Sequence, residues 1–277
     1  MKPISREEQR QIELEMLLYV DSVCRKNQIE YTLAGGSLLG AVRHRGMIPW
    51  DDDIDILLLR PAYEKLTALL RHDDRYRLVV PEENAYFYPF AKLMDRNTVL
   101  KMLNHHETRI PDFGVYIDIF PVDGCPDSHD EQYRFQKKLR RELQDVRMSI
   151  FRSYCDSGTF VRRMAKAVLF FPKHLALRLK KKPEEWKKFL LDDMQTYPVQ
   201  TSHYAGFLLS VYEEILPTAV YEEYMDIDFE GHSLRSIKAY DTYLKKLYGD
   251  YMTPPPEDKR ISAHQYTAFR KENKSVK

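Results

Sequence analysis

The feature that most constrains this chain is a pair of carboxylates at the start of an apolar strand. Asp53 and Asp55 lie two positions apart in residues 51–59 (DDDIDILLL), whose second half has strand character. Side chains two apart on a strand project from the same face, with a rise of about 6.6 Å between their backbones. Like charges this close raise one another's pKa unless a cation neutralises them. The pattern therefore predicts a fold that brings an ion to this end of the strand.

A third carboxylate is expected from a second strand. In residues 114–120 (GVYIDIF) the apolar side chains at 115, 117 and 119 share one face, and Asp118 lies on the other. Oxygen ligands suit Mg²⁺ or Mn²⁺. Carboxylates on adjacent strands could hold two such ions about 3.5–4 Å apart, as phosphoryl transfer requires. Asp53, Asp55 and Asp118 are the predicted catalytic set. Asp51 is either a fourth metal ligand or a solvated group, and Asp52 points away.

A cluster of glycines precedes the acidic motif. The chain has 10 glycines, and four of them fall within residues 35–46, directly after a short strand expected at 31–34. A Gly-Gly-Ser turn that leads from a strand into a helix presents backbone N–H groups and a hydroxyl to a phosphate. Gly35, Gly36 and Ser37 are thus predicted phosphate-binding residues.

Four cations near these motifs are candidates for neutralising a pyrophosphate. They are Arg43, His44 and Arg45, between the two motifs, and Lys92, in a further predicted strand. Arginine suits bidentate contact with phosphate. Each of the first three is, taken alone, better explained as a surface charge, but at least one of the three is expected to contact phosphate.

The order strand, Gly-Gly-Ser, helix, Asp-Ile-Asp, third aspartate is typical of nucleotidyltransferases. Residues 35–55 (GGSLLGAVRHRGMIPWDDDID) closely resemble the LicD family, phosphotransferases of the nucleotidyltransferase superfamily whose relatives include fukutin and fukutin-related protein. Further matching blocks are residues 91–95 (AKLMD), 114–124 (GVYIDIFPVDG) and 243–252 (YLKKLYGDYM). Residues 129–200 carry no such match.

The resemblance implies an enzyme that moves phosphocholine from CDP-choline to a sugar hydroxyl of a teichoic acid or another lipid-linked cell-surface glycan precursor, releasing CMP. It implies that Asp53 and Asp55 bind Mg²⁺ or Mn²⁺, and that Asp118 is a further ligand or the base. Transfer of ribitol phosphate, of another phospho-sugar, or of a nucleotide from a nucleoside di- or triphosphate are alternatives. A membrane-surface binding module is the non-enzymatic alternative.

Choline, as a quaternary ammonium, is recognised by aromatic faces and carboxylates. The densest aromatic stretch is residues 86–90 (YFYPF), and Trp50 lies next to the acidic motif. Packing in the core is the stronger explanation for residues 86–90, and a choline site is the other.

The formal net charge of +1 conceals two opposed regions. Residues 134–190 hold seventeen Lys and Arg against five Asp and Glu, a net of +12, which leaves −11 for the remainder. Within this region, residues 159–182 mix bulky apolar side chains with Lys and Arg. Such a segment can lie on an anionic membrane, or its apolar face can be core. Nucleic acid is not an expected partner, because no recognition-helix signature is present.

These patterns predict an α/β (α+β) fold with two parts. A nucleotidyltransferase-like mixed sheet with flanking helices is expected over residues 1–128, with helices at about 5–26 and 61–70. A mostly helical accessory region, punctuated by prolines at 172, 183, 198 and 217, is expected over 129–277, with its end packed back on the core. The absence of a signal peptide, of a spanning run and of patterned cysteines predicts a cytoplasmic protein, with peripheral contact at the inner face of the plasma membrane.

Overall fold

The first long helix begins at the cap that the sequence predicts. The computed structural model describes residues 1–83, 86–102, 110–150, 153–155, 157, 159–260 and 266–272. Helix α1 (Arg6–Asn27) starts after Ser5, whose Oγ accepts a hydrogen bond from the Glu8 backbone N–H at 3.1 Å. This bond satisfies one of the N–H groups that the first turn leaves without a helical partner. The apolar side of α1 then joins the main core through Met16, Leu17 and Val20.

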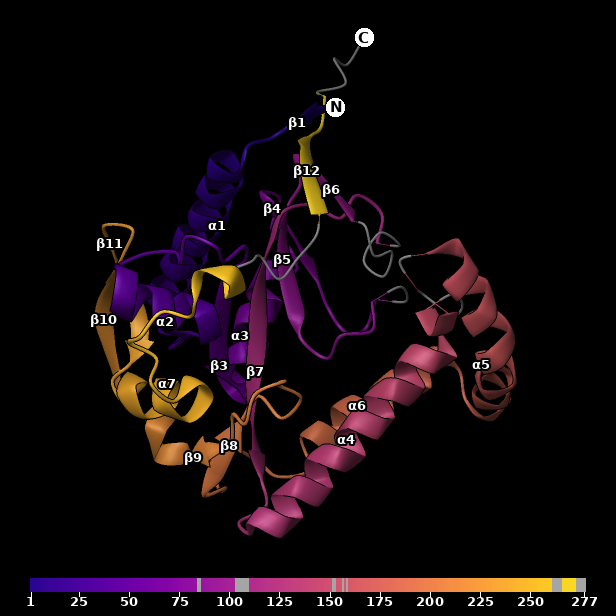
Figure 1. Cartoon of the computed structure of the whole chain (residues 1–277). Helices are drawn as coiled ribbons and strands as arrows, with labels where there is room; N and C mark the ends of the chain where they lie inside the picture. The colour runs from indigo at the N-terminus through magenta and orange to yellow at the C-terminus, as the bar shows by residue number, and fades with distance from the viewer. Residues whose placement is uncertain are drawn as a thin grey trace.

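A mixed sheet forms the centre of the molecule (Figure 1). Its main strands run in the order β2-β3-β7-β5-β4, and β8 pairs with β7 and β9 with β8. Strands β3 and β7 are parallel, whereas the other pairs are antiparallel. The bounds are β2 (Thr32–Leu33), β3 (Asp55–Leu59), β4 (Tyr76–Val79), β5 (Ala91–Asp95), β7 (Tyr116–Cys125), β8 (Tyr204–Gly206) and β9 (Leu216–Pro217).

Two short helices connect these strands. Helix α2 (Gly35–His44) follows β2, and helix α3 (Arg60–Leu70) follows β3, with Pro61 in its first turn as expected. Proline is tolerated there because the first N–H groups of a helix have no intrahelical acceptor. The three cysteines, Cys24, Cys125 and Cys155, are buried, and none of them is in a disulfide. The mixed α/β fold is as the sequence predicts.

A helical arm extends from the foot of β7. Helix α4 (His129–Ser149) leaves the sheet, and α5 (Phe160–Lys180) lies at the far end of α4. Helix α6 (Pro183–Met194) packs alongside α4 (Figure 1). The expected interruption at Pro172 is wrong, because α5 runs through this residue without ending. The proline removes one backbone hydrogen bond, but the flanking residues remain helical. Short 3₁₀ turns are η2 (Ser153–Cys155), η3 (Thr218–Tyr221) and η4 (Glu257–Lys259).

The rest of the chain returns to the sheet. A hairpin of β10 (Tyr224–Phe229) and β11 (His232–Ile237), which the sequence patterns did not predict, packs near β2 and is followed by α7 (Tyr240–Tyr248). Strand β12 (Tyr266–Arg270) pairs with both β1 (Lys2–Pro3) and β6 (Thr98–Met102), so the two ends of the chain meet. None of the helices that the structure describes has a stretch apolar and long enough to cross a bilayer.

Candidate active site

Three carboxylates converge at the start of the parallel strand pair. Oxygens of Asp53, Asp55 and Asp118 all lie within 4.8 Å of one another. Asp55 is the first residue of β3 and is in register with Asp118 on β7, whose backbone N–H donates to the Ile54 carbonyl at 2.8 Å. The expectation that Asp53 belongs to the strand is wrong, because β3 begins at Asp55. Asp53 still reaches the same cluster from the preceding loop.

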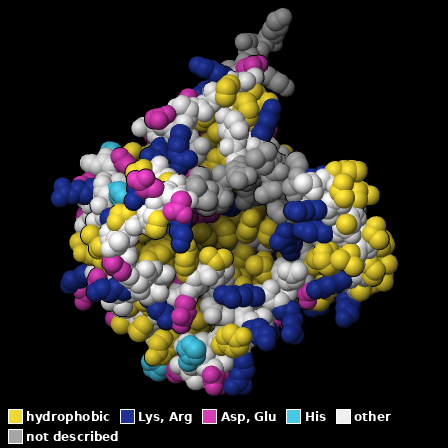
Figure 2. Space-filling view, in the orientation of Figure 1, with side chains coloured by type: hydrophobic (Ala, Val, Ile, Leu, Met, Phe, Trp, Pro, Cys, Tyr) yellow, Lys and Arg dark blue, Asp and Glu magenta, His cyan; other side chains and the backbone are white. Residues whose placement is uncertain are grey.

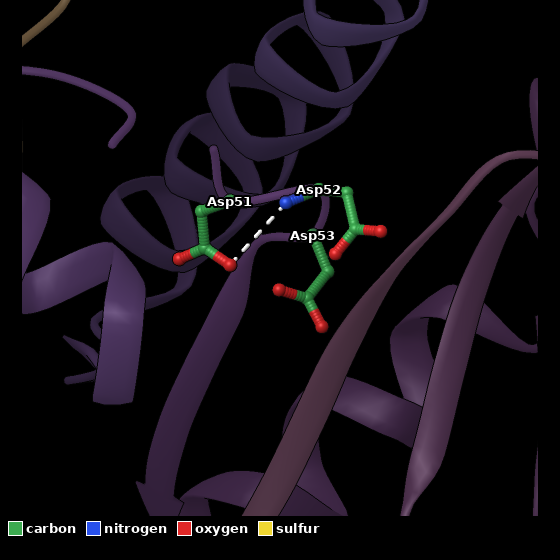
Figure 3. Close-up of side chains that lie close together, drawn as sticks. All are labelled: Asp51, Asp52 and Asp53. Carbon is green, nitrogen blue, oxygen red and sulfur yellow. Dashed lines mark hydrogen bonds between the residues drawn. The ribbon is translucent and has the colours of Figure 1, made fainter. Parts of the chain in front are cut away.

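The loop before β3 contributes two further carboxylates. Asp51 and Asp52 group with Asp53, and the Asp52 backbone N–H donates to Oδ1 of Asp51 at 3.2 Å (Figure 3). The loop is fixed from outside, because Arg6 donates to the Asp51 carbonyl at 2.5 Å and the Tyr266 hydroxyl donates to the Asp52 carbonyl at 2.8 Å. Asp51 and Asp53 line the cavity described below, whereas Asp52 is buried and does not.

The electrostatics of the cluster call for a cation. Burial raises the pKa of Asp55 well above its ordinary value, and Asp53, Asp118 and Asp51 raise it further. Within the described part of the chain, Oδ1 of Asp55 is buried and accepts no hydrogen bond. A buried carboxylate oxygen without a donor is costly unless a cation binds it. The oxygen donors of Asp53, Asp55 and Asp118 therefore fit a hard divalent ion such as Mg²⁺ or Mn²⁺.

The described residues supply one cation to this cluster, Lys92. Its Nζ donates to both carboxylate oxygens of Asp118, at 2.6 and 2.9 Å, from the paired position on β5. Lys92 is only 3% exposed, lies 3.7 Å from the Tyr116 ring centroid and does not line the cavity. The structure therefore brings Lys92 to Asp118, and its contact with a phosphate stays a prediction.

The start of α2 faces the same carboxylates. Gly35 has a φ of 48°, and a Cβ added to it would lie 3.4 Å from Oδ2 of Asp55. A Cβ added to Gly36 would overlap Oδ2 of Asp51. Because these glycines carry no side chain, the helix N-terminus approaches the cluster closely. Ser37 is buried, and its Oγ accepts a hydrogen bond from the Asp55 backbone N–H at 2.9 Å, so it fixes the start of β3.

A cavity of about 830 Å³ opens beside the cluster (Figure 2). Gly35, Gly36, Asp51, Asp53 and Asp55 line one end of it. The rest of the wall is largely apolar and comes from distant parts of the chain, and it includes nine aromatic residues: Trp50, Tyr88, Phe90, Phe120, Phe207, Tyr212, Tyr243, Tyr248 and Tyr251. Of the predicted aromatic stretch, Tyr88 and Phe90 therefore reach the cavity, while Tyr86 and Phe87 are buried in hydrophobic clusters.

A buried acid lies at this aromatic wall. Glu214 lines the cavity, and its Oε1 accepts a hydrogen bond from the Tyr243 hydroxyl at 2.5 Å. The same hydroxyl accepts a hydrogen bond from the Gly35 backbone N–H at 3.3 Å, so one tyrosine joins the acid to the start of α2. Burial raises the pKa of Glu214 to about 7. No sequence pattern pointed to Glu214, although its partner Tyr243 opens the matching block of residues 243–252.

The three predicted cations of the 43–45 segment are dispersed. Arg43 lines the cavity, and its Nη1 donates to the Tyr251 carbonyl at 2.7 Å. His44 packs edge-on against Trp50, with ring centroids 6.0 Å apart, and burial lowers its pKa. Arg45 ends α2 with a φ of 56°, and its carbonyl accepts from the Glu230 backbone N–H. Of these three residues, only Arg43 reaches the cavity wall.

Comparison with known proteins agrees with this arrangement. Residues 28–151 match the family model described as the LicD/FKTN/FKRP nucleotidyltransferase domain. The chain is 28% identical over 280 residues to the lipopolysaccharide cholinephosphotransferase LicD of Haemophilus influenzae, an alignment that covers 97% of this chain and 99% of that protein.

Two shorter alignments are found as well. The human ribitol 5-phosphate transferase FKRP is 50% identical over 42 residues, which is 15% of this chain and 8% of that protein. An uncharacterised protein of Rickettsia prowazekii is 43% identical over 61 residues, or 22% of this chain and 23% of its own length. The resemblance indicated by the motifs is thus confirmed, and the match to the LicD/FKTN/FKRP nucleotidyltransferase domain covers residues 28–151, which hold the carboxylates and the start of α2.

Proposed function

We propose that the protein is a metal-dependent phosphotransferase that moves phosphocholine from CDP-choline to a sugar hydroxyl of a cell-surface glycan precursor, such as a teichoic acid, and releases CMP. The observation that carries this proposal is the junction of a three-carboxylate cluster with a large aromatic cavity that contains a buried acid. The carboxylate cluster, with bound metal ions, suits a pyrophosphate donor, and the aromatic cavity suits a quaternary ammonium group.

Asp53, Asp55 and Asp118 hold the divalent ions in this proposal. Bound Mg²⁺ or Mn²⁺ would neutralise charge on the phosphates and on the leaving group. Lys92 donates two hydrogen bonds to the Asp118 carboxylate, and both side chains are buried. Asp118 is therefore better suited to bind an ion than to reach the acceptor as a base. Asp53 and Asp55 line the cavity, and the proton of the acceptor passes to one of them.

The reaction is an in-line displacement at the choline-linked phosphorus. The acceptor oxygen forms a new P–O bond, and the bond from that phosphorus to the bridging oxygen breaks, so CMP leaves with the bridging oxygen. The start of α2 supplies N–H groups and the positive end of a helix to the phosphates. Arg43, at the cavity wall, is the residue that can contact the nucleotide half of the donor.

The aromatic wall favours choline over ribitol as the transferred group. A trimethylammonium group donates no conventional hydrogen bond and is held by ring faces and by a carboxylate. Tyr212 and Tyr248 stand edge-to-face with centroids 5.2 Å apart, and Glu214 lies at the same wall. A polyol such as ribitol would call for several hydrogen-bonding groups. Ribitol phosphate remains the second candidate because of the local similarity to FKRP.

The test is CMP release from a panel of donors. CDP-choline, CDP-ribitol and CTP are each incubated with the protein and a mixture of sugar acceptors, with Mg²⁺, Mn²⁺ or EDTA. We expect metal-dependent CMP release from CDP-choline, and a loss of about a hundredfold or more in kcat for Asp53→Asn. Asp127→Asn is the matched control, because Asp127 is an exposed aspartate that pairs with His203.

Other results would separate the alternatives. Turnover of CDP-ribitol alone would replace choline by ribitol phosphate, and pyrophosphate release from CTP would identify a nucleotide transferase. Full activity of Asp53→Asn, or activity in EDTA, would contradict the role of the carboxylate cluster.

A further inference from the structure

Helix α5 turns its apolar side toward solvent. Eight of its large apolar side chains are exposed: Phe160, Val161, Met164, Val168, Leu169, Phe171, Leu175 and Leu179. Val168 and Leu179 are 75% and 79% exposed. In an ordinary helix of a globular protein, the apolar stripe faces the core. We call these eight residues the α5 apolar face.

The α5 apolar face is continuous along the helix. Phe160, Met164, Val168, Phe171, Leu175 and Leu179 follow one another at spacings of three or four residues, which places them on one side. With Val161 and Leu169 they cover about half of the circumference at about 3.6 residues per turn. Figure 2 shows apolar side chains gathered at the edge of the molecule where Figure 1 places α5.

The opposite side of α5 is already occupied. Leu177 is buried in a small cluster with Met148, Tyr154 and Cys155. His174 stacks on Tyr154, and its Nδ1 lies 2.8 Å from the Met148 carbonyl. Since this side anchors α5 to the rest of the arm, the α5 apolar face is left outward in the folded chain.

The charges on helix α5 itself are all of one sign, and one of them, Lys173, pairs with Asp145 of α4 at 3.0 Å. Helix α5 contains no Asp or Glu and carries Arg162, Arg163, Lys166, Lys173, Arg178 and Lys180. Arg162, Arg178 and Lys180 are exposed. Lys181 and Lys182 follow directly. Lysine is depleted at the centre of protein–protein interfaces. A basic rim around an apolar face instead suits anionic lipids.

We propose that the α5 apolar face docks on an anionic lipid bilayer, with the apolar side chains inserted below the headgroups and the Lys and Arg side chains against them. The helix lies in the interface and does not cross it, in agreement with the lack of a spanning helix among the described residues. This inference does not rest on the proposed reaction. It would apply equally to an enzyme with another donor.

Vesicle flotation of the full chain tests the proposal. We expect binding to vesicles of phosphatidylcholine with phosphatidylglycerol at low salt, weaker binding at high salt, and little binding to phosphatidylcholine alone, since screening weakens contacts with exposed charges. The double variant Leu169→Gln/Leu179→Gln should bind at least about tenfold more weakly, because each inserted leucine contributes apolar area.

The controls separate insertion from other effects. Tyr133→Ser removes an exposed ring from α4, outside the α5 apolar face, and should bind like the parent protein; Tyr133 is 62% exposed. A second double variant, Val161→Gln/Val168→Gln, should show the same loss of vesicle binding. Circular dichroism should show that both double variants are folded. Brominated lipids should quench the tryptophan fluorescence of a Leu169→Trp variant more strongly than that of the parent protein.

Three results would overturn the proposal. One is the absence of binding to anionic vesicles at low salt. Another is binding that both double variants retain. The third is a dimer in sedimentation velocity that forms without lipid and is lost in both double variants, because a second copy of the chain would then cover the α5 apolar face.

Discussion

At the scale of single residues, Asp55 combines a structural cost with a functional use. Its carboxylate is buried among Asp53, Asp118 and Asp51, with one oxygen lacking a donor in the described part of the chain. Asp55→Asn should therefore raise the melting temperature of the metal-free protein, while abolishing the further rise that Mn²⁺ gives the parent protein. Differential scanning calorimetry with and without Mn²⁺ measures both effects. Equal Mn²⁺ stabilisation of parent and variant would contradict the metal assignment.

Gly36 is expected to be needed for space and not for backbone conformation. An added Cβ would overlap the flexible end of the Asp51 side chain, which can move aside. Gly36→Ala should thus change the free energy of unfolding by less than about 1 kcal/mol, since alanine favours the helix. It should nevertheless lower CMP release, because Asp51 is displaced from the cavity end. Urea unfolding and the donor assay test the two halves, and a fully active variant would show that Asp51 is dispensable.

Glu214 predicts a pH dependence of stability. Burial raises its pKa from 4.5 to about 7, so the folded state binds this proton more tightly than the unfolded chain. The resulting contribution, about 3 kcal/mol at most, is fully present below about pH 4.5 and is lost as the pH rises toward 7. The free energy of unfolding, measured with urea, should differ less between pH 5 and pH 7.5 for Glu214→Gln than for the parent protein. Glu213→Gln, an exposed neighbour paired with Lys246, should keep the parent difference.

Single residues also show what sequence motifs can and cannot predict. Asp55 and Asp118 were expected together because each lies on a recognisable strand and the order of the motifs is typical of nucleotidyltransferases; the parallel pairing of β3 and β7 brings them into register. The role of Ser37 could not be predicted in this way, because whether its hydroxyl faces a phosphate or the Asp55 backbone depends on how α2 packs on β3. Lys92 was expected near phosphate, and its pairing with Asp118 needed the register of β5 and β7.

At the scale of elements, Pro172 makes a test of α5. The residue lies inside the helix, where its ring and its missing N–H disfavour the helix by about 3 kcal/mol. Pro172→Ala should restore one backbone hydrogen bond and raise the free energy of unfolding by about 1–3 kcal/mol. Chemical denaturation measures this gain. An unchanged or lower value would mean that α5 unfolds separately from the rest of the chain.

Elements with a local signature were predictable, and those fixed by distant partners were not. The capped helix α1 and the proline-led helix α3 carry their own start signals. The sequence signal for the hairpin of β10 and β11 is the glycine at position 231. Glu230 and Gly231 both have positive φ, as a two-residue hairpin turn requires. Strands β8 and β9 are only three and two residues long, too short for periodicity to detect.

At the scale of the whole molecule, the two ends of the chain support the acidic loop. Tyr266 of β12 donates to the Asp52 carbonyl and accepts from Nε2 of Gln9 on α1, at 2.8 Å each. Deleting residues 266–277 should therefore lower stability and weaken Mn²⁺ binding together. Tyr266→Phe should reproduce part of both effects, at about 1 kcal/mol of stability. Calorimetry and Mn²⁺ titration would contradict this view if the deletion left Mn²⁺ affinity intact.

The division of the chain at residue 128 stays a prediction. Strand β8 pairs with β7 across that boundary, and Leu143, Phe207, Glu214 and Tyr248 line the same cavity as Asp53 and Asp55. The sequence predicted that the end of the chain packs back on the core, but it did not predict which residues line the cavity, because residues more than a hundred positions apart become neighbours only when the sheet and α7 are assembled.

The divided origin of the cavity has a consequence for how such enzymes can diversify. The carboxylates and the start of α2 come from residues 35–118, whereas much of the wall that would hold the transferred group comes from residues 207–255. If the proposed function holds, substitutions in the later segment should change which head group fits without touching the residues proposed to hold the ions. Exchanging residues 207–255 between relatives is accordingly a direct route to altered donor choice, with the reaction chemistry left in place.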